Sequence, residues 1–261
     1  MPPPADPALL DDAVDLARRA GELTLRWFRS ADLVIDRKTD GSPVTEADKA
    51  AERLIRAELA ERWPDDAILG EEEGITDGTS GRRWFIDPID GTKAFTHGVP
   101  LYTNLIAVDD EHGPAVGVIN MPALGETVYA GRGLGCFCDG APTRVSDRTR
   151  ASGGYLTTSG FDYWPEDMLA AVRSSGLQMR TWGDGYGYAL VAAGRVDVMV
   201  DPVAGAWDLA PMPVVIGEAG GRFTDVGGVE RIDGGSGVAT NGHLHDEVVA
   251  LLSPGGPARL D

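Results

Sequence analysis

Three groups of acidic side chains in the sequence are candidates for shared chemistry. Glutamates fill Glu71–Glu73, two aspartates flank a proline turn at Asp87 and Asp90, and another aspartate stands at Asp208. A turn of this kind can direct both of its carboxylates and the Ile89 carbonyl into one pocket. Hard cations such as Mg²⁺ prefer oxygen ligands of these types. The sequence therefore predicts a site for a divalent cation.

The same turn continues into a segment that suits an anion. Gly91 and Thr92 lead into Lys93–Phe95, where a helix is expected to begin, so backbone N–H groups and the helix dipole would face a phosphate. Taken singly, each group has an ordinary structural explanation, because Asp-Pro and Asp-Gly are common turn dipeptides. Together, metal ligands beside a phosphate-binding turn indicate chemistry on a phosphate ester.

The composition narrows the class of protein. Of the 261 residues, 43% are apolar and 25% are charged, which is typical of a globular protein. There are 23 basic and 41 acidic residues, so the net charge is −18, and neither nucleic acid nor an anionic membrane surface is expected as a partner. No apolar run approaches the roughly 20 residues that span a bilayer. The first residues do not resemble a secretion signal, so a cytoplasmic location is expected.

Residues 1–150 are predicted to form an N-terminal α+β lobe. Helical spacing of apolar residues predicts helices over 6–29 and 45–63, with Asp6 as the N-cap of the first. Short apolar segments between Gly-, Pro- and Asp-rich turns predict strands at 67–69, 83–86, 101–108, 115–120 and 127–130. This pattern indicates an antiparallel sheet packed on the two helices. The lobe would carry most of the candidate metal ligands.

Residues 151–261 are predicted to form a C-terminal α/β lobe. Strands are expected at 155–158, 179–181, 196–200 and 237–239, alternating with helices at 165–175, 186–194, 207–219 and 243–252. The end of the chain, Ser253–Asp261, is expected to fray. Asp208, the third acidic group, lies in this half of the chain.

Several of these motifs resemble the inositol monophosphatase family. They are Val44–Asp48, Gly70–Glu72, Asp87–Thr92, Trp207–Asp208 and Glu218–Gly221, and they follow the family's order over most of the chain. The resemblance implies a layered αβαβα sandwich and a Mg²⁺-dependent phosphatase that acts on a small-molecule phosphate monoester. It also implies a homodimer, since members of the family commonly dimerise.

The resemblance assigns metal ligands as well. It implies that two or three Mg²⁺ ions are held by the carboxylates of Glu71, Asp87, Asp90 and Asp208 and by the carbonyl of Ile89, with Asp87 bridging two of the ions. Glu71 would also count among the catalytic groups. Four carboxylates this close would repel one another without a cation.

Further residues match the family's catalytic and phosphate-binding positions. By resemblance, the Thr92 hydroxyl would hydrogen-bond Asp48 and so orient or activate the attacking water. Backbone N–H groups of Gly91 and Thr92 would bind the phosphate, and Lys38 matches a position where the family often has a lysine near the site. The chain departs from the family at Ala94, where asparagine is usual, so a hydrogen bond that holds the loop is expected to be lost.

The second half of the chain bears on the substrate. Trp182–Leu190 and Gly194–Pro202 resemble histidinol-phosphate phosphatases of the bacterial inositol-monophosphatase type. The resemblance implies that Asp184 and Asp201 place negative charge opposite the metals, where they would bind the amine and imidazole of L-histidinol phosphate. A structural alternative for Asp184 is that it caps the helix beginning near Gly185.

The resemblance leaves other functions open. Within the enzyme class, inositol 1-phosphate and adenosine 3′,5′-bisphosphate are alternative substrates. Outside it, a regulatory member of the family would bind RNA or a protein partner instead of catalysing a reaction. The net charge of −18 and the complete set of candidate ligands favour the phosphatase hypothesis.

Overall fold

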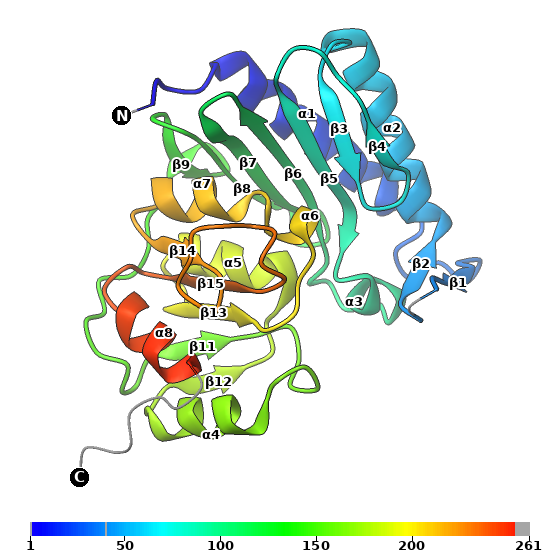
Figure 1. Cartoon of the computed structure of the whole chain (residues 1–261). Helices are drawn as coiled ribbons and strands as arrows, with labels where there is room; N and C mark the ends of the chain where they lie inside the picture. The colour runs from blue at the N-terminus through cyan, green and yellow to red at the C-terminus, as the bar shows by residue number, and fades with distance from the viewer. Residues whose placement is uncertain (1, 40, 254–261) are drawn as a thin grey trace.

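The computed structural model describes residues 2–39 and 41–253, and over this range two β-sheets alternate with three layers of helices (Figure 1). One outer layer consists of α1 (Pro7–Thr24) and α2 (Glu46–Arg62). The middle layer holds α5 (Asp184–Ala192), α6 (Ala206–Leu209) and α7 (Met212–Glu218), and the other outer layer holds α4 (Glu166–Ser174) and α8 (His245–Leu252). The predicted αβαβα sandwich is therefore confirmed.

Helix α1 begins where the sequence predicts and ends earlier. The carboxylate of Asp6 accepts a hydrogen bond from the Ala8 N–H at 2.9 Å and so caps the helix. The prediction that the helix extends to residue 29 is wrong, because α1 ends at Thr24. There, bonds between residues three apart, such as Trp27 N–H to Thr24 O at 3.0 Å, replace the α-helical ladder.

The larger sheet has eight strands in the order β10-β9-β8-β7-β6-β5-β3-β4. Its strands are β3 (Ala67–Gly70), β4 (Gly74–Thr76), β5 (Arg83–Asp90), β6 (Thr103–Asp110), β7 (Gly113–Met121), β8 (Glu126–Gly131), β9 (Gly135–Cys138) and β10 (Ala141–Pro142). All neighbours are antiparallel except β3 and β5. The parallel β3–β5 pair departs from the predicted antiparallel sheet, because the chain leaves β3 through the edge strand β4 before it enters β5.

The smaller sheet has five strands in the order β12-β11-β13-β15-β14. They are β11 (Tyr155–Thr157), β12 (Gln178–Arg180), β13 (Val198–Asp201), β14 (Arg222–Thr224) and β15 (Gly237–Thr240). Strand β11 pairs in parallel with β12 and β13, whereas β15 pairs antiparallel with β13 and β14. The single helix predicted over 207–219 is divided into α6 and α7, because Pro211 has no backbone N–H to continue α6.

Residues from both halves of the chain share one apolar core. Leu105 and Ile119 of the larger sheet belong to the same buried cluster as Tyr188 of α5 and Val215 of α7. This cluster fills the space between the two sheets and fixes the middle helices against both. Strand β10 ends and β11 begins on either side of residue 150, and the division into two lobes there stays a prediction.

Two short elements lie where β5 ends (Figure 1). They are the hairpin of β1 (Ile35–Arg37) and β2 (Pro43–Thr45), and the helix α3 (Thr92–Thr96).

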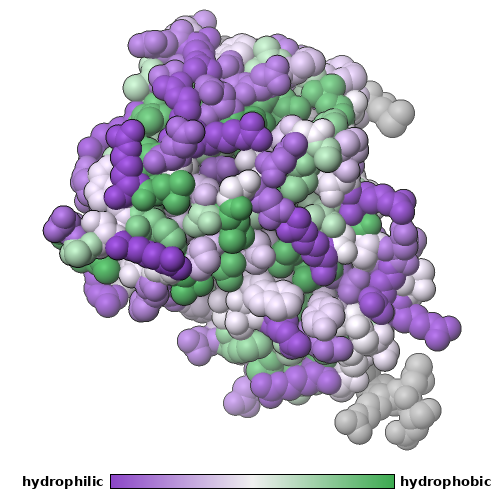
Figure 2. All heavy atoms as spheres, turned by 180° about the vertical axis from the view of Figure 1, so that it is seen from behind, coloured by the Kyte–Doolittle hydropathy of each residue, from purple (hydrophilic) through white to green (hydrophobic). Residues whose placement is uncertain are grey.

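Fraying is predicted for Ser253–Asp261. All of these residues except Ser253 lie outside the described part of the chain. In the described part of the chain, no helix is both long and apolar enough to cross a membrane. Seen from behind, the surface mixes hydrophilic residues with separate apolar ones (Figure 2).

Candidate active site

The fold brings Asp87, Asp90 and Asp208 together. Each offers a carboxylate oxygen, and these oxygens lie within 4.8 Å of one another. Asp87 and Asp90 are buried at the end of β5, and Asp208 comes from α6. In a regular strand, side chains three residues apart point to opposite faces. The pairing of β5 with β6 shifts register between Asp87 and Asp90, and this irregularity lets both side chains reach one site.

Neighbouring elements hold the carboxylate of Asp90. The Thr103 hydroxyl donates to Asp90 Oδ2 at 2.8 Å, and the backbone N–H of Gly185 donates to the same oxygen. A Cβ atom on Gly185 would lie 2.4 Å from the Thr103 hydroxyl, so only glycine allows this close approach. Asp208 accepts a hydrogen bond from the Gly205 N–H at 2.8 Å. The first turn of α5 therefore reaches across to a side chain at the end of β5.

The cluster is an assembly of mutually repelling carboxylates. Burial, and then the nearby charges of Glu71, Asp90 and Asp208, raise the pKa of Asp87 well above its ordinary value. Burial and the charges of Asp184 and Asp208 do the same to the pKa of Asp90, and burial raises that of Asp208 to about 6. The Oδ1 atom of Asp87 is buried without a hydrogen-bond partner. A hard cation would relieve this repulsion and satisfy that oxygen, so the donor set fits a metal ion.

Glu71 lies beside this cluster and is paired with Lys38. The Lys38 Nζ atom lies 2.7 Å from Glu71 Oε1 and 2.6 Å from Glu72 Oε1. Lys38 follows β1 in the small hairpin, so that hairpin folds over the turn between β3 and β4. The negative charge of Glu71 contributes to the raised pKa of Asp87. The structure therefore brings both predicted residues, Lys38 and Glu71, to the edge of the carboxylate cluster.

The predicted hydrogen bond between Thr92 and Asp48 is not formed. The Thr92 hydroxyl donates to the Ile89 carbonyl at 3.0 Å. Asp48 instead belongs to the capping box of α2, where its Oδ2 accepts from the Thr45 N–H at 2.8 Å and the Thr45 hydroxyl at 2.6 Å. Each group therefore bonds to a partner three residues away in the sequence. Asp48 Oδ1 stays buried without a hydrogen-bond partner, and burial raises the pKa of Asp48 to about 6.

Hydrogen bonds from other residues hold the end of β5 and the start of α3, where the hydrogen bond expected from the family's usual asparagine is replaced by Ala94. The side-chain amide of Asn104 donates to the Pro88 carbonyl at 2.6 Å, and Asn120 donates in turn to Asn104 at 2.9 Å. The Thr96 hydroxyl donates to the Thr92 carbonyl at 2.9 Å. Sequence reasoning missed Asn104, although polar residues inside an otherwise apolar strand are a signal that could have found it.

Asp184 lies near the turn at Gly91 and near the carboxylate cluster. Its Oδ2 lies 2.9 Å from the position of a Cβ built on Gly91, and its charge contributes to the raised pKa of Asp90. The structure thus places Asp184 beside the predicted phosphate-binding turn, and its position opposite the metals stays a prediction. The helix-cap alternative is not supported, since α5 has Gly183 at its N-cap and no side-chain cap. Asp184 adopts φ = 55°, which is uncommon for a residue other than glycine.

Asp201 is buried, and one of its carboxylate oxygens accepts hydrogen bonds from Ser159. Its Oδ1 accepts from the Ser159 N–H at 3.1 Å and from the Ser159 hydroxyl at 2.7 Å. The Ser159 oxygen in turn accepts from the Asp184 N–H at 2.8 Å. Burial raises the pKa of Asp201 to about 7. The structure thus links Asp201 to Asp184 through Ser159, a residue that no motif in the sequence points out.

Residues 7–254 match the sequence model of the inositol monophosphatase family, and the chain belongs to that family. It is therefore a phosphoric monoester hydrolase. The chain is 45% identical to a histidinol-phosphatase of Mycobacterium tuberculosis over 93% of its own length and 97% of that protein. It is 42% identical to a histidinol-phosphatase of Chlorobaculum parvum over 93% of the chain and 96% of that protein.

A solved structure shares the fold over almost the whole chain. The extragenic suppressor protein suhB from Bartonella henselae superposes with a TM-score of 0.88 at 30% identity, covering 95% of this chain and 99% of that one. The two sheets and three helical layers described above are therefore the architecture of a known family structure.

Proposed function

We propose that this chain is a Mg²⁺-dependent phosphatase that hydrolyses L-histidinol phosphate to L-histidinol and inorganic phosphate. The observation that carries the proposal is its similarity, over more than nine-tenths of its length, to two proteins named histidinol-phosphatase. The buried trio of Asp87, Asp90 and Asp208 supports the metal-dependent part.

In this proposal two or three Mg²⁺ ions are held by five groups, the carboxylates of Asp87, Asp90, Asp208 and Glu71 and the carbonyl of Ile89. The Ile89 carbonyl has a second lone pair, so it can serve as a ligand while it accepts the Thr92 hydroxyl. When bound, Mg²⁺ would neutralise the phosphoryl oxygens, lower the pKa of a water molecule and stabilise the leaving alkoxide. Glu71 would have to give up its contact with Lys38.

The remaining residues bind and orient the reactants. The backbone N–H groups of Gly91 and Thr92, at the start of α3, would donate to the phosphate, and the freed ammonium of Lys38 would lie close enough to assist. Asp48 would accept a hydrogen bond from the attacking water through its unpartnered Oδ1. Thr92 would help to orient that water independently of Asp48.

The cationic end of the substrate is assigned to Asp184. L-Histidinol phosphate carries an amine and an imidazole, whereas inositol 1-phosphate carries hydroxyl groups. The half-buried carboxylate of Asp184 lies beside Gly91 and would accept a charged donor. Asp201 would act on substrate choice through Ser159, because its own Oδ1 is occupied. A homodimer and a cytoplasmic location are part of the proposal and stay predictions.

A substrate panel tests the proposal. Phosphate release is measured in Mg²⁺ with L-histidinol phosphate, inositol 1-phosphate and adenosine 3′,5′-bisphosphate at matched concentrations. The expected result is the highest kcat/KM for L-histidinol phosphate. A higher kcat/KM for either of the other two esters would overturn the substrate assignment, but the proposed phosphatase activity would stand. Absence of phosphate release from all three would favour the regulatory alternative, for which RNA binding is the next assay.

A further inference from the structure

A buried carboxylate lies directly beneath the turn that carries Glu71. Glu52 on α2 has a side chain with no solvent exposure. Its Oε2 accepts a hydrogen bond from the Glu72 N–H at 2.8 Å, and its Oε1 accepts from the Glu73 N–H at 3.0 Å. Two successive backbone N–H groups directed at one anion form a cradle for negative charge. In this chain the cradle is filled by a side chain of the protein itself.

Arg56 ties the same turn to α2 at a second place. Its Nε donates to Glu52 Oε1 at 2.8 Å, one turn earlier on the helix. Its other nitrogens donate to the Gly74 carbonyl at 2.5 Å and to the Thr76 hydroxyl at 2.8 Å. The guanidinium thus joins the helix to the end of the turn and to strand β4, and it also neutralises the buried charge of Glu52.

The close contact restricts the start of the turn as well. A Cβ atom on Gly70 would lie 2.0 Å from Glu52 Oε1, so a larger residue here would displace the carboxylate from its hydrogen bonds. On the next residue, the Glu71 N–H donates to the Ile86 carbonyl at 3.1 Å. The backbone is therefore fixed by Ile86 at Glu71 and by Glu52 at the two residues that follow.

We propose that Glu52, supported by Arg56, is a positioning residue for Glu71. The pair fixes the backbone of the β3–β4 turn so that Glu71 stays beside the Asp87 cluster, and its carboxylate has only to exchange Lys38 for a cation when one binds. Preorganising a ligand in this way raises metal affinity, because less conformational freedom is lost on binding. This inference rests on the metal-binding role proposed above for Glu71.

A purely structural role makes a different prediction. Buried ion pairs often contribute little net stability, and an apolar pair of similar volume can replace them. If Glu52 and Arg56 only fill space, a substitution of either residue would change the free energy of unfolding but not the affinity for Mg²⁺. If they position Glu71, the affinity for Mg²⁺ must fall, and excess Mg²⁺ must restore turnover.

The test compares Mg²⁺ binding by the full chain and its variants, using isothermal titration calorimetry on metal-free protein. Glu52→Gln keeps the shape of the side chain but turns an N–H₂ group toward the backbone N–H groups or Arg56. We expect its apparent Kd for Mg²⁺ to rise about 10- to 100-fold, as for other groups that orient metal ligands. At saturating Mg²⁺, kcat should recover to within a few fold of the wild-type value. Arg56→Gln, which keeps Glu52, should shift Kd in the same direction by less.

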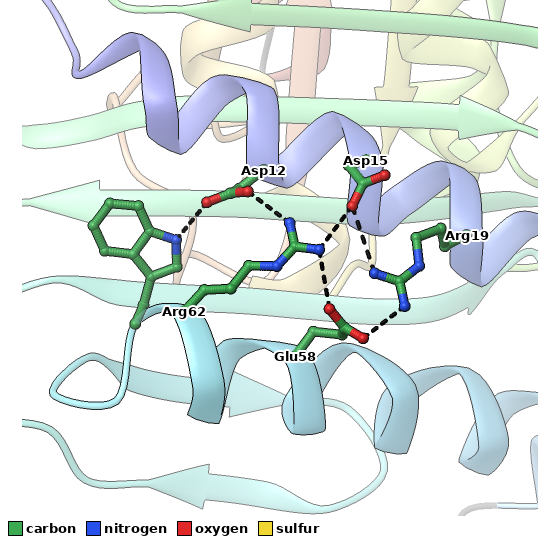
Figure 3. A network of polar contacts seen from close by, with 6 residues as sticks. Asp12, Asp15, Arg19, Glu58 and Arg62 are labelled. Atoms are coloured by element: carbon green, nitrogen blue, oxygen red, sulfur yellow. Dashed lines mark hydrogen bonds and ion pairs between the residues drawn. The ribbon is translucent and has the colours of Figure 1, made fainter.

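Glu58→Gln is the matched control. Glu58 also lies on α2 and pairs with Arg19 and Arg62 in the network between α1 and α2 (Figure 3). Its variant should bind Mg²⁺ with the wild-type Kd. Wild-type Kd values in Glu52→Gln and Arg56→Gln, or equal losses in these and in Glu58→Gln, would overturn the inference. Thermal unfolding of each metal-free variant shows whether it is folded. If Glu52→Gln does not fold, the Kd of Arg56→Gln decides whether the pair positions Glu71.

Failure of the proposed function is a separate outcome. A wild-type chain that binds Mg²⁺ but does not hydrolyse L-histidinol phosphate refutes the proposed substrate and leaves the comparison of Kd values valid. A wild-type chain that binds no Mg²⁺ overturns both proposals.

Discussion

Two charged regions of the molecule differ in whether the chain itself pairs their charges. One is the ion-pair network on α1 and α2, and the other is the carboxylate cluster at the end of β5. In the network, Arg19 and Arg62 alternate with Asp12, Asp15 and Glu58 at distances of 2.6 to 3.6 Å (Figure 3). Hydrogen bonds from Arg19 and Arg62 lower the pKa of Glu58 to about 2. Every charge in this network has a partner supplied by the chain, and the side chains remain partly exposed.

The cluster of Asp87, Asp90 and Asp208 has the reverse properties. Among the described residues, no ion pair reaches these three carboxylates, and their pKa values are raised instead of lowered. The contrast is between charges that the chain pairs at the surface of α1 and α2 and a buried group of unpaired carboxylates that could hold a cation.

The largest expected effect comes from removing one carboxylate of the cluster. Asp87→Asn should reduce phosphate release from L-histidinol phosphate to background, because it removes a proposed ligand of two ions. The thermal midpoint in EDTA should stay the same or rise, because a repelling buried charge is gone. Initial rates and thermal unfolding measure the two effects. Asp12→Asn in the network is the control and should keep wild-type turnover, and normal turnover in Asp87→Asn would remove Asp87 from the site.

The next effect concerns the charge that lies closest to the phosphate-binding turn. Asp184→Asn should raise KM for L-histidinol phosphate by roughly 10-fold or more, since hydrogen bonds to charged groups contribute about 1.5–3 kcal/mol. KM for inositol 1-phosphate should change little, because that ester has no cation. Steady-state kinetics with both esters measure the difference. An equal rise for both would mean that Asp184 acts through its neighbour Asp90 and not on the substrate cation.

A smaller effect links pH to the stability of the metal-free protein. Burial raises the pKa of Asp208 from 3.8 to about 6, so the folded state binds more protons than the unfolded chain between about pH 4 and 6. The free energy of unfolding in EDTA should therefore fall as pH rises through this window, by on the order of 1–3 kcal/mol from this group.

Urea unfolding of the wild type and of Asp208→Asn at several pH values measures this slope. The variant should lose part of it and keep the part due to Asp48 and Asp201, whose pKa values burial also raises, to about 6 and about 7. An unchanged slope in Asp208→Asn would show that this carboxylate is not the repelled group described above.

The smallest effect is expected in the network itself. Arg62→Gln removes contacts with Asp12, Asp15 and Glu58, yet these side chains are partly exposed and their attraction is screened. The thermal midpoint should fall by no more than a few degrees, and less at high salt. Turnover should stay at the wild-type value. Thermal unfolding at low and high salt checks this, and a large loss that salt does not reduce would contradict the contrast between the two clusters.

The sequence could predict the cluster because its residues occupy short motifs at the ends of elements. Asp87 and Asp90 lie at the end of β5 and Asp208 lies in α6, and the resemblance of these motifs to the family implied that the three carboxylates meet. The capping of α1 was predictable because Asp6 acts within two residues of its own position.

Other contacts were not predictable because local and distant partners compete for the same side chain. Thr92 and Asp48 each find a partner within three residues, and no spacing reveals which bond is formed. Asp201 is held by Ser159, which is 42 positions away in the sequence. Glu52 and Arg56 have the spacing of an ordinary exposed helix pair, and only the packing of the β3–β4 turn on α2 shows that they are buried.

We expect the carboxylate cluster to support turnover only when a divalent cation occupies it. The most direct measurement is the initial rate of phosphate release from L-histidinol phosphate as a function of Mg²⁺ concentration, with excess chelator as the zero point. We expect a background rate in chelator and a saturable rise with Mg²⁺ that is absent in Asp87→Asn. Turnover that persists in excess chelator, or a Mg²⁺ response that survives in Asp87→Asn, would contradict this expectation.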